Sequence, residues 1–262
     1  MDNEIFFCLL KTNHYISHIR FDSGEKMTFI ITICVREGIV MASDSRLTFN
    51  LTQQAQNQQI TQTAVIQSDT NYKTFLMQNK NGISFFGQAE INGVPISGFI
   101  ENFINATPQT NVSQVPQQLL NYFRSLPGPP HIYCHIAGYE INSQSIPEQH
   151  VYDVNVFNNS FTRLQSPVAW GGESDILHRL IQPLWTRSGQ PGNYSYDALP
   201  FYNIQFQLFT LQDAIDFSIY AIKATIDSMN FQPRPKTVGG PIDVLVIKPD
   251  RALFIQRKEL HG

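Results

Sequence analysis

A hydroxyl, a carboxylate and a guanidinium stand at fixed separations in one short stretch of this sequence. Residues 28–35 and 38–44 are two apolar runs rich in β-branched residues, and the polar link between them ends in a glycine. Such a pattern predicts a β-hairpin, because glycine readily adopts the positive φ that a tight turn requires. Antiparallel pairing would bring Thr28, at the free end of the first strand, beside Asp44 and Arg46 at the far end of the second.

The chemistry open to these residues depends on whether Thr28 begins the chain. A threonine hydroxyl has little basicity, but a free α-amine with a pKa of about 7.7 to 8.0 can accept its proton directly or through water. One residue would then supply both nucleophile and base. If the preceding residues stay attached, Thr28 is an ordinary strand residue and the Asp44–Arg46 pair is structural.

Composition limits the other function classes. The chain has 262 residues, 42% of them apolar, which is enough for one large domain. A net charge of −3, a charged fraction of 15% and the absence of a Lys/Arg run argue against nucleic acid as a partner. The three scattered cysteines suit a reducing cytoplasm, and no apolar run approaches the roughly 20 residues of a membrane helix. We expect a soluble, cytoplasmic protein.

A metal site is not expected. His131, Cys134 and His135 carry suitable ligand atoms, but strand alternation places Cys134 on the opposite face from both histidines. We therefore predict no metal and no cofactor.

The remaining pattern alternates strands with pairs of helices. Residues 51–63 are rich in Gln, Asn and Thr and are interpreted as a polar loop. Two further segments suggest a helix capped by Ser174 and a capping box at Thr210, with a Gly/Pro-containing loop between these helices. The predicted strands are 71–77, 82–87, 131–139, 151–157, 161–165, 241–247 and 251–256, and the predicted helices are 94–104, 115–126, 174–185 and 210–229.

From Met27 onward these features resemble the β-type subunits of proteasomes and their bacterial relatives of the HslV and Anbu type. Thr28, Asp44 and Arg46 keep the register of that family, and Lys73 and Gly87 stand at the family's lysine-to-glycine separation. The segment from Gly239 to Ile247, Gly-Gly-Pro-Ile-Asp-Val-Leu-Val-Ile, is also similar. The resemblance implies an α+β fold, the four-layer αββα sandwich of N-terminal nucleophile hydrolases, which would bury the predicted apolar stripes.

The resemblance also implies roles for individual residues. Lys73 would lower the pKa of the Thr28 amine, Asp44 would keep that lysine charged and oriented, and the Gly87 N–H would stabilise the oxyanion. With Phe85 at its base, the specificity pocket would be shallow and would prefer small or medium apolar side chains. Residues implied to bind substrate are Arg46, in the family's register, Thr48 and Ala89 through their backbones, and Leu47, Asn71, Phe85 and Gly93 as the pocket lining.

The resemblance implies an N-terminal extension at residues 1–27 and a proteasome-like peptidase domain at 28–262. The apolar run at 5–10 follows two acidic residues, where a secretory signal would carry positive charge, so export is disfavoured. The extension could be a propeptide that is removed, as in many proteasome β subunits. Alternatively, translation could begin at Met27, whose small successor permits removal of the methionine. The second route is slightly favoured, because Met27 replaces the glycine usual at proteasome autocleavage sites.

Some positions depart from the family's pattern. Gly172 or its neighbour stands where active subunits have a serine, and Pro235 and Val238 replace an Asp and a Ser, although Ser174 or Thr237 could substitute. Three functions are therefore consistent with the sequence. The first is a threonine-type endopeptidase in a homo-oligomeric ring that admits unfolded polypeptide or peptides, with a possible ATPase partner. The others are a catalytically inactive scaffold of the same kind and an amide hydrolase acting on a small molecule.

Overall fold

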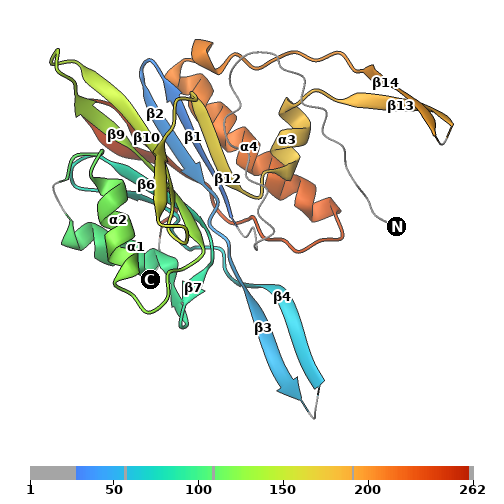
Figure 1. Cartoon of the computed structure of the whole chain (residues 1–262), viewed down its shortest axis with the longest axis horizontal. Coiled ribbons are helices and arrows are strands. Elements are labelled where there is room, and N and C mark those ends of the chain that lie inside the picture. Colours follow the sequence, from blue (N-terminus) through green and yellow to red (C-terminus); the bar gives the residue numbers. More distant parts are fainter. Residues whose placement is uncertain (1–27, 56–57, 108–109, 191, 260–262) are drawn as a thin grey trace.

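The computed structural model describes residues 28–55, 58–107, 110–190 and 192–259. The extension at 1–27 lies outside these residues, so both predicted routes to a terminal Thr28 stay predictions. Figure 1 shows the arrangement of the helices and strands.

The first five-stranded sheet contains the predicted N-terminal hairpin. Strands β1 (Phe29–Val35) and β2 (Gly38–Ser43) pair antiparallel, as predicted, with Ile30 opposite Ser43 and Val35 opposite Gly38. The sheet order is β12-β1-β2-β15-β16. The added strands are β12 (Val168–Gly172), β15 (Asp243–Ile247) and β16 (Ala252–Gln256).

The second five-stranded sheet has the order β11-β10-β9-β6-β5, and its strands β5 and β6 lie within the predicted strands at 71–77 and 82–87. All of its pairings are antiparallel. Its strands are β5 (Thr74–Leu76), β6 (Gly82–Gly87), β9 (Ile132–Ile141), β10 (Pro147–Asn155) and β11 (Ser160–Arg163).

The two sheets meet through a small apolar cluster. Its buried members come from β2, β9, β10 and β15 and are Ile39, Met41, Ala137, Val151, Leu245 and Ile247. The Thr32 hydroxyl of β1 lies 3.0 Å from His135 Nδ1 of β9, so a hydrogen bond also joins the sheets. Cys134 belongs to the core on the other face of β9, which confirms that it and His135 point in opposite directions.

Within the described residues, four helices pack against these strands. Helices α1 (Ile96–Ala106) and α2 (Val115–Arg124) share a core with the second sheet. Helices α3 (Asp175–Ile181) and α4 (Leu211–Phe231) share a core with the first. The predicted capping box at the start of α4 is confirmed, because Thr210 and Asp213 exchange the two hydrogen bonds of that motif.

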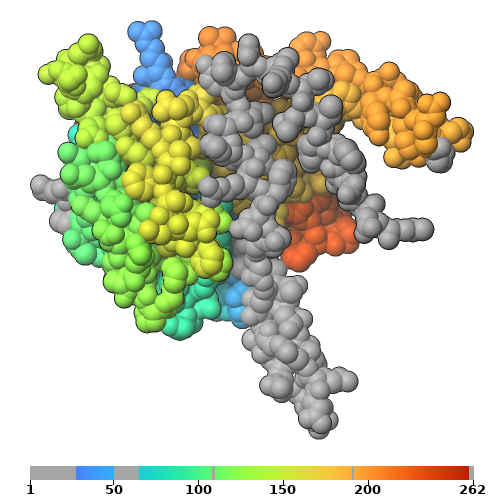
Figure 2. Space-filling model, viewed as in Figure 1, coloured from blue at the N-terminus to red at the C-terminus, as the bar shows by residue number. Residues whose placement is uncertain are grey.

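Two segments predicted as loops form hairpins instead. β3 (Leu47–Ala55) and β4 (Gln58–Ser68) pair over the polar segment, and β13 (Trp185–Gln190) pairs with β14 (Asn193–Ala198) between α3 and α4. Figure 1 shows both hairpins extending away from the sheets, and Figure 2 shows that β13–β14 projects from the rest of the molecule. Two-residue strands β7 (Glu90–Ile91) and β8 (Val94–Pro95) and the 3-10 turn η1 (Phe206–Leu208) complete the elements.

Helix α3 is shorter than predicted. It ends at Ile181, and Gln182 is extended with ψ of 150°. Pro183 follows, and a proline disfavours the helical conformation of the residue before it. The apolar spacing to Trp185 therefore did not indicate a continuing helix.

The predicted fold class was wrong. The structure is mostly antiparallel β-sheet, with 39% strand and 24% helix in four helices, and does not match a four-layer αββα sandwich with helices flanking the sheets. Helix α4, with 21 residues, runs close along β1 and β2, whereas α1, α2 and α3 have only 11, 10 and 7 residues. The expectation failed because three two-stranded hairpins outside the main sheets shift the balance towards strand.

None of the helices in the described ranges combines the length and the apolarity that crossing a membrane requires.

The buried His135 should make stability depend on pH. Burial lowers its pKa, and the nearby Asp153 acts in the opposite direction. Between the folded and unfolded pKa values of His135, the unfolded chain therefore binds more protons than the folded chain. The folded protein has its full stability above about pH 6.5, where the imidazole is neutral in both states, and loses stability as the pH falls towards the folded pKa. We expect urea unfolding of wild type to show a steeper loss of stability between pH 7.5 and pH 5.5 than the His135→Gln variant. Equal slopes would contradict a neutral buried imidazole.

Candidate active site

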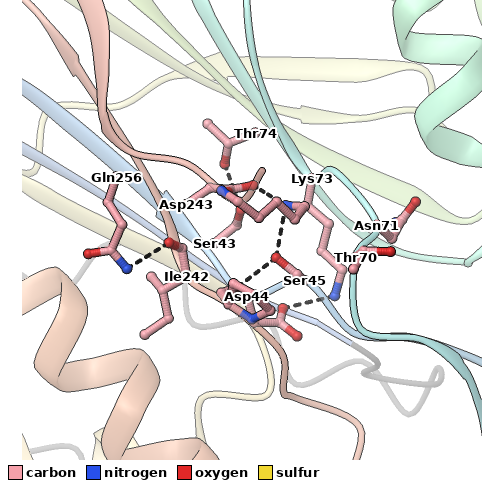
Figure 3. Close-up of polar contacts among 12 residues, drawn as sticks. Ser43, Asp44, Ser45, Thr70, Asn71, Lys73, Thr74, Ile242, Asp243 and Gln256 are labelled. Atoms are coloured by element: carbon pink, nitrogen blue, oxygen red, sulfur yellow. Dashed lines mark hydrogen bonds and ion pairs between the residues drawn. The ribbon is translucent and has the colours of Figure 1, made fainter. Parts of the chain in front are cut away.

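The carboxylate of Asp44 is the centre of the site. It directly follows β2 and is fully buried. Oδ1 accepts the Phe29 N–H at 3.0 Å and the Lys73 ammonium at 2.8 Å, while Oδ2 accepts the N–H groups of Arg46 at 3.1 Å and Gly239 at 3.0 Å. Four donors thus fix both oxygens at the end of the strand, as Figure 3 shows for the ion pair with Lys73.

Thr28 lies at the open end of β1, beside this carboxylate. The peptide N–H that follows it, that of Phe29, shares the acceptor Asp44 Oδ1 with Lys73. Its carbonyl accepts the Glu173 N–H at 2.7 Å, and the residue is 4% exposed. The predicted grouping of Thr28, Asp44 and Lys73 is therefore present in the structure.

Lys73 is a buried cation held just before β5. Its side chain is 2% exposed, and its carbonyl accepts the Phe85 N–H at 3.0 Å. Burial lowers the pKa of the ammonium, and the Asp44 ion pair acts in the opposite direction. The positive charges of Lys258 and Arg46 lower this pKa further. Lys73 therefore shares with the Phe29 N–H the carboxylate oxygen that lies beside Thr28.

A chain of hydroxyl groups joins the two sheets under this ion pair. The Thr74 hydroxyl donates to Ser43 Oγ at 2.8 Å and lies 2.9 Å from Ser84 Oγ. All three side chains are fully buried. Because Thr74 follows Lys73 and Ser43 precedes Asp44, these bonds fix the two charged residues against each other (Figure 3).

Gly87, the predicted oxyanion donor, ends β6 in a conformation that favours glycine. Its φ is +110°, and a Cβ would stand 2.4 Å from the carbonyl oxygen of His131. Backbone N–H groups alternate in direction along a strand. The N–H of Phe85 faces Lys73, so that of Gly87, two residues further on, is directed to the same side.

Arg46 was predicted to bind substrate, and in the structure its guanidinium binds Asp69 and a backbone carbonyl. Its Nε and Nη2 donate to the two oxygens of Asp69 at 2.6 and 2.7 Å, and Nη1 donates to the Lys236 carbonyl at 3.1 Å. The hydrogen bonds that it donates to Asp69 raise the pKa of the guanidinium, although burial acts against them. The Arg46 guanidinium also lies against Gly239, where an added Cβ would stand 2.4 Å from Cζ.

The backbone positions predicted to pair with a peptide are partly occupied. Thr48 pairs with Ile66 of β4, so one side of its strand is already used within the β3–β4 hairpin. The Ala89 carbonyl accepts the Ile96 N–H at 3.0 Å. A bound peptide would therefore have to use the remaining edge of β3 and the Ala89 N–H.

Of the predicted pocket residues, Asn71, Phe85 and Gly93 lie near α1. Asn71 accepts a hydrogen bond from Ser97 at 2.9 Å through Oδ1, and the Phe85 ring is 3% exposed in the core shared with α1 and α2. Gly93 is exposed, has a φ of +79°, and donates to the Glu90 carboxylate. Leu47 is half-buried and pairs with Ser68. The predicted preference for small apolar side chains stays a prediction.

A steric constraint explains why position 172 is a glycine. Its φ is +86°, and a Cβ would stand 1.7 Å from the Thr28 carbonyl oxygen, so a serine cannot occupy this backbone position. Ser174 and Thr237 are both buried, and Thr237 Oγ1 has no hydrogen-bond partner among the described residues. Whether either hydroxyl replaces the expected serine stays a prediction. Of the other two departures, Val238 is a core residue and Pro235 is exposed.

A second buried ion pair was missed at the sequence level. Asp243 of β15 binds the Lys258 ammonium, and both side chains are at most 2% exposed. Ser45 and Asp69 were missed as well, although they hold Lys258 and Arg46. Asp243 carried a signal, because a carboxylate inside the apolar run from Ile242 to Ile247 requires a buried partner.

Comparison with protein-family models and with curated proteins found no match to this chain.

Proposed function

We propose that the chain is an N-terminal nucleophile amide hydrolase, specifically a threonine-type endopeptidase that acts once Thr28 is the first residue. One observation carries the proposal. A single oxygen of Asp44 binds both the buried Lys73 ammonium and the peptide N–H that follows Thr28. A buried lysine beside the start of a strand supplies the fixed positive charge that this chemistry needs.

The reaction would proceed through an ester to Thr28. The hydroxyl oxygen attacks the peptide carbonyl carbon while its proton passes to the α-amine, and Gly87 N–H donates to the resulting oxyanion. The proton then moves to the leaving nitrogen, the C–N bond breaks, and the first product departs as an amine. Water attacks the ester with the same amine as base, which releases the acid and restores the hydroxyl. No cofactor is required.

The proposed substrate is an extended peptide or unfolded polypeptide. The remaining edge of β3 at Thr48 and the Ala89 N–H could align a strand, with Phe85 limiting the side chain next to the cleaved bond. Assembly into a homo-oligomeric ring would restrict entry to unfolded chains, and a partner ATPase would fit that arrangement.

A second candidate is a scaffold of the same kind that lacks catalysis. It is favoured by Gly172, since the close approach of the Thr28 carbonyl excludes a supporting serine there. The test must therefore detect the nucleophile itself.

The proposed experiment compares chains that begin at Met27 with chains that retain residues 1–27. The N-terminal residue is read by intact mass, and both are treated with a peptide epoxyketone that carries a small apolar residue next to its reactive group. This reagent forms one bond to the hydroxyl and one to the amine of an N-terminal threonine. We expect stoichiometric labelling of the chain that begins at Thr28 and none of the retained extension.

Two variants make the labelling specific. Thr28→Ala should abolish it, whereas Thr186→Ala, at an exposed threonine of β13, should leave it unchanged. Absence of labelling in a folded chain that begins at Thr28 would favour the scaffold. Labelling with turnover of small amides and none of peptides would indicate a small-molecule hydrolase.

A further inference from the structure

The segment after β16 reaches back to the site through Lys258. Its ammonium binds the Asp243 carboxylate and donates to Ser45 Oγ at 2.8 Å, and its own N–H donates to Asp243 Oδ1 at 2.9 Å. The lysine side chain is 2% exposed and the aspartate is fully buried. A buried ion pair of this kind is retained only where geometry and further hydrogen bonds compensate desolvation.

Lys258 contacts the neighbours of both members of the Asp44–Lys73 pair. Ser45, which follows Asp44, accepts from Lys258 and donates to the Pro241 carbonyl at 2.6 Å. Tyr72, which precedes Lys73, lies under the ammonium, 4.3 Å from Nζ to the ring centroid. The Lys258–Asp243 pair is therefore joined to both chain segments that carry the catalytic charges, and Figure 3 shows Asp243 beside Ser43, Ser45 and Thr74.

We propose that Lys258, held by Asp243, is a positioning residue for the reaction at Thr28. Through Ser45 it fixes Asp44, through Tyr72 it fixes Lys73, and its charge acts on the Lys73 ammonium. The inference rests on the proposed function, since positioning has meaning only for a reacting Thr28. The segment after β16 would then be required for the reaction at Thr28.

Several charged groups surround the Lys258–Asp243 and Lys73–Asp44 pairs and contribute to the pKa values of the two lysines. Lys73 faces Asp44, with Arg46 and Lys258 as nearby cations and Asp69 beyond Arg46. Lys258 faces Asp243 and Asp44, with Arg257 next to it. Because Lys258 lowers the pKa of Lys73, removing its charge should raise the pKa of Lys73.

The test uses a double variant, Lys258→Met with Asp243→Asn, in the chain that begins at Thr28. Removing one partner alone would leave an unpaired buried charge and could prevent folding, whereas the neutral pair avoids that cost. Two quantities are measured, the rate of epoxyketone labelling and the titration of Lys73 by NMR of labelled lysine side chains. We expect labelling to slow by about tenfold or more, since small displacements of catalytic groups have such effects. We also expect the Lys73 titration to move to higher pH.

The matched control is Lys223→Met with Asp227→Asn, an exposed ion pair of α4 with a separation of 2.9 Å, which should change neither quantity. Lys258→Arg keeps the charge and should leave the Lys73 titration at its wild-type pH. If the wild-type protein is labelled, two results overturn the proposal. In the first, the double variant is labelled at the wild-type rate. In the second, it is labelled more slowly but Lys73 titrates at the wild-type pH. If wild type does not label but Lys73 titrates higher in the double variant, the proposed function fails while the coupling of the two lysines stands.

Discussion

Replacing Lys73 with Met is expected to reduce cleavage and epoxyketone labelling at Thr28 by about 10³-fold or more, within the range of a lost acid–base function. The variant removes the buried cation but keeps a side chain of similar length. Because it leaves the buried Asp44 carboxylate without its ion-pair partner, the comparison uses variant protein whose circular dichroism shows that it is folded. Without that charge, the α-amine of Thr28 gains a higher pKa and is protonated near neutral pH. The acid limb of the kcat/KM profile should therefore move to higher pH, in addition to the lower maximum.

The control for this prediction is Lys80→Met. Lys80 lies in the turn between β5 and β6, donates to the Pro249 carbonyl at 3.2 Å and is exposed. Its replacement removes the same charge from the same hairpin without contact with Asp44, so labelling and the pH profile should stay at wild type. A Lys73→Met variant that labels at the wild-type rate with an unmoved profile would mean that Lys73 is only a core lysine.

Sequence was a good guide where a local pattern and its physical cause coincide. The first hairpin follows from two β-branched runs around a turn, and α4 follows from its capping box. The meeting of Thr28 and Asp44 followed from one hairpin, since the ends of paired strands must meet. The place of Lys73, just before β5 in the other sheet, followed only from the resemblance.

The errors have physical causes as well. The polar segment before Ser68 was interpreted as a loop because it has little to bury, yet its backbone pairs as strands β3 and β4. The second ion pair joins residues far apart, with Lys258 and Ser45 separated by 213 positions. No local pattern indicates such a contact, although the buried Asp243 showed that a partner must exist. The fold class was wrong because the two-stranded hairpins outside the main sheets were not anticipated.

Asp44→Asn should have the largest effect on stability among substitutions in the site. The amide cannot accept at both ends, so it leaves either the Phe29 N–H and Lys73 or the N–H groups of Arg46 and Gly239 facing a donor. Loss of the counter-charge to a buried lysine typically costs about 3–5 kcal/mol. Urea unfolding measures this, and Asp227→Asn in the exposed α4 pair should change stability by less than about 0.5 kcal/mol.

The pH dependence of that loss separates charge from packing. In Asp44→Asn the pKa of buried Lys73 falls further, because burial then acts without the opposing carboxylate. The unfolded chain binds more protons than the folded one between the two pKa values, so the stability of the variant rises with pH across that interval. The deficit relative to wild type should therefore narrow between pH 6 and pH 9. A deficit that stays constant would show that the protonation of Lys73 does not depend on Asp44 and that Asp44 acts through its hydrogen bonds to the backbone.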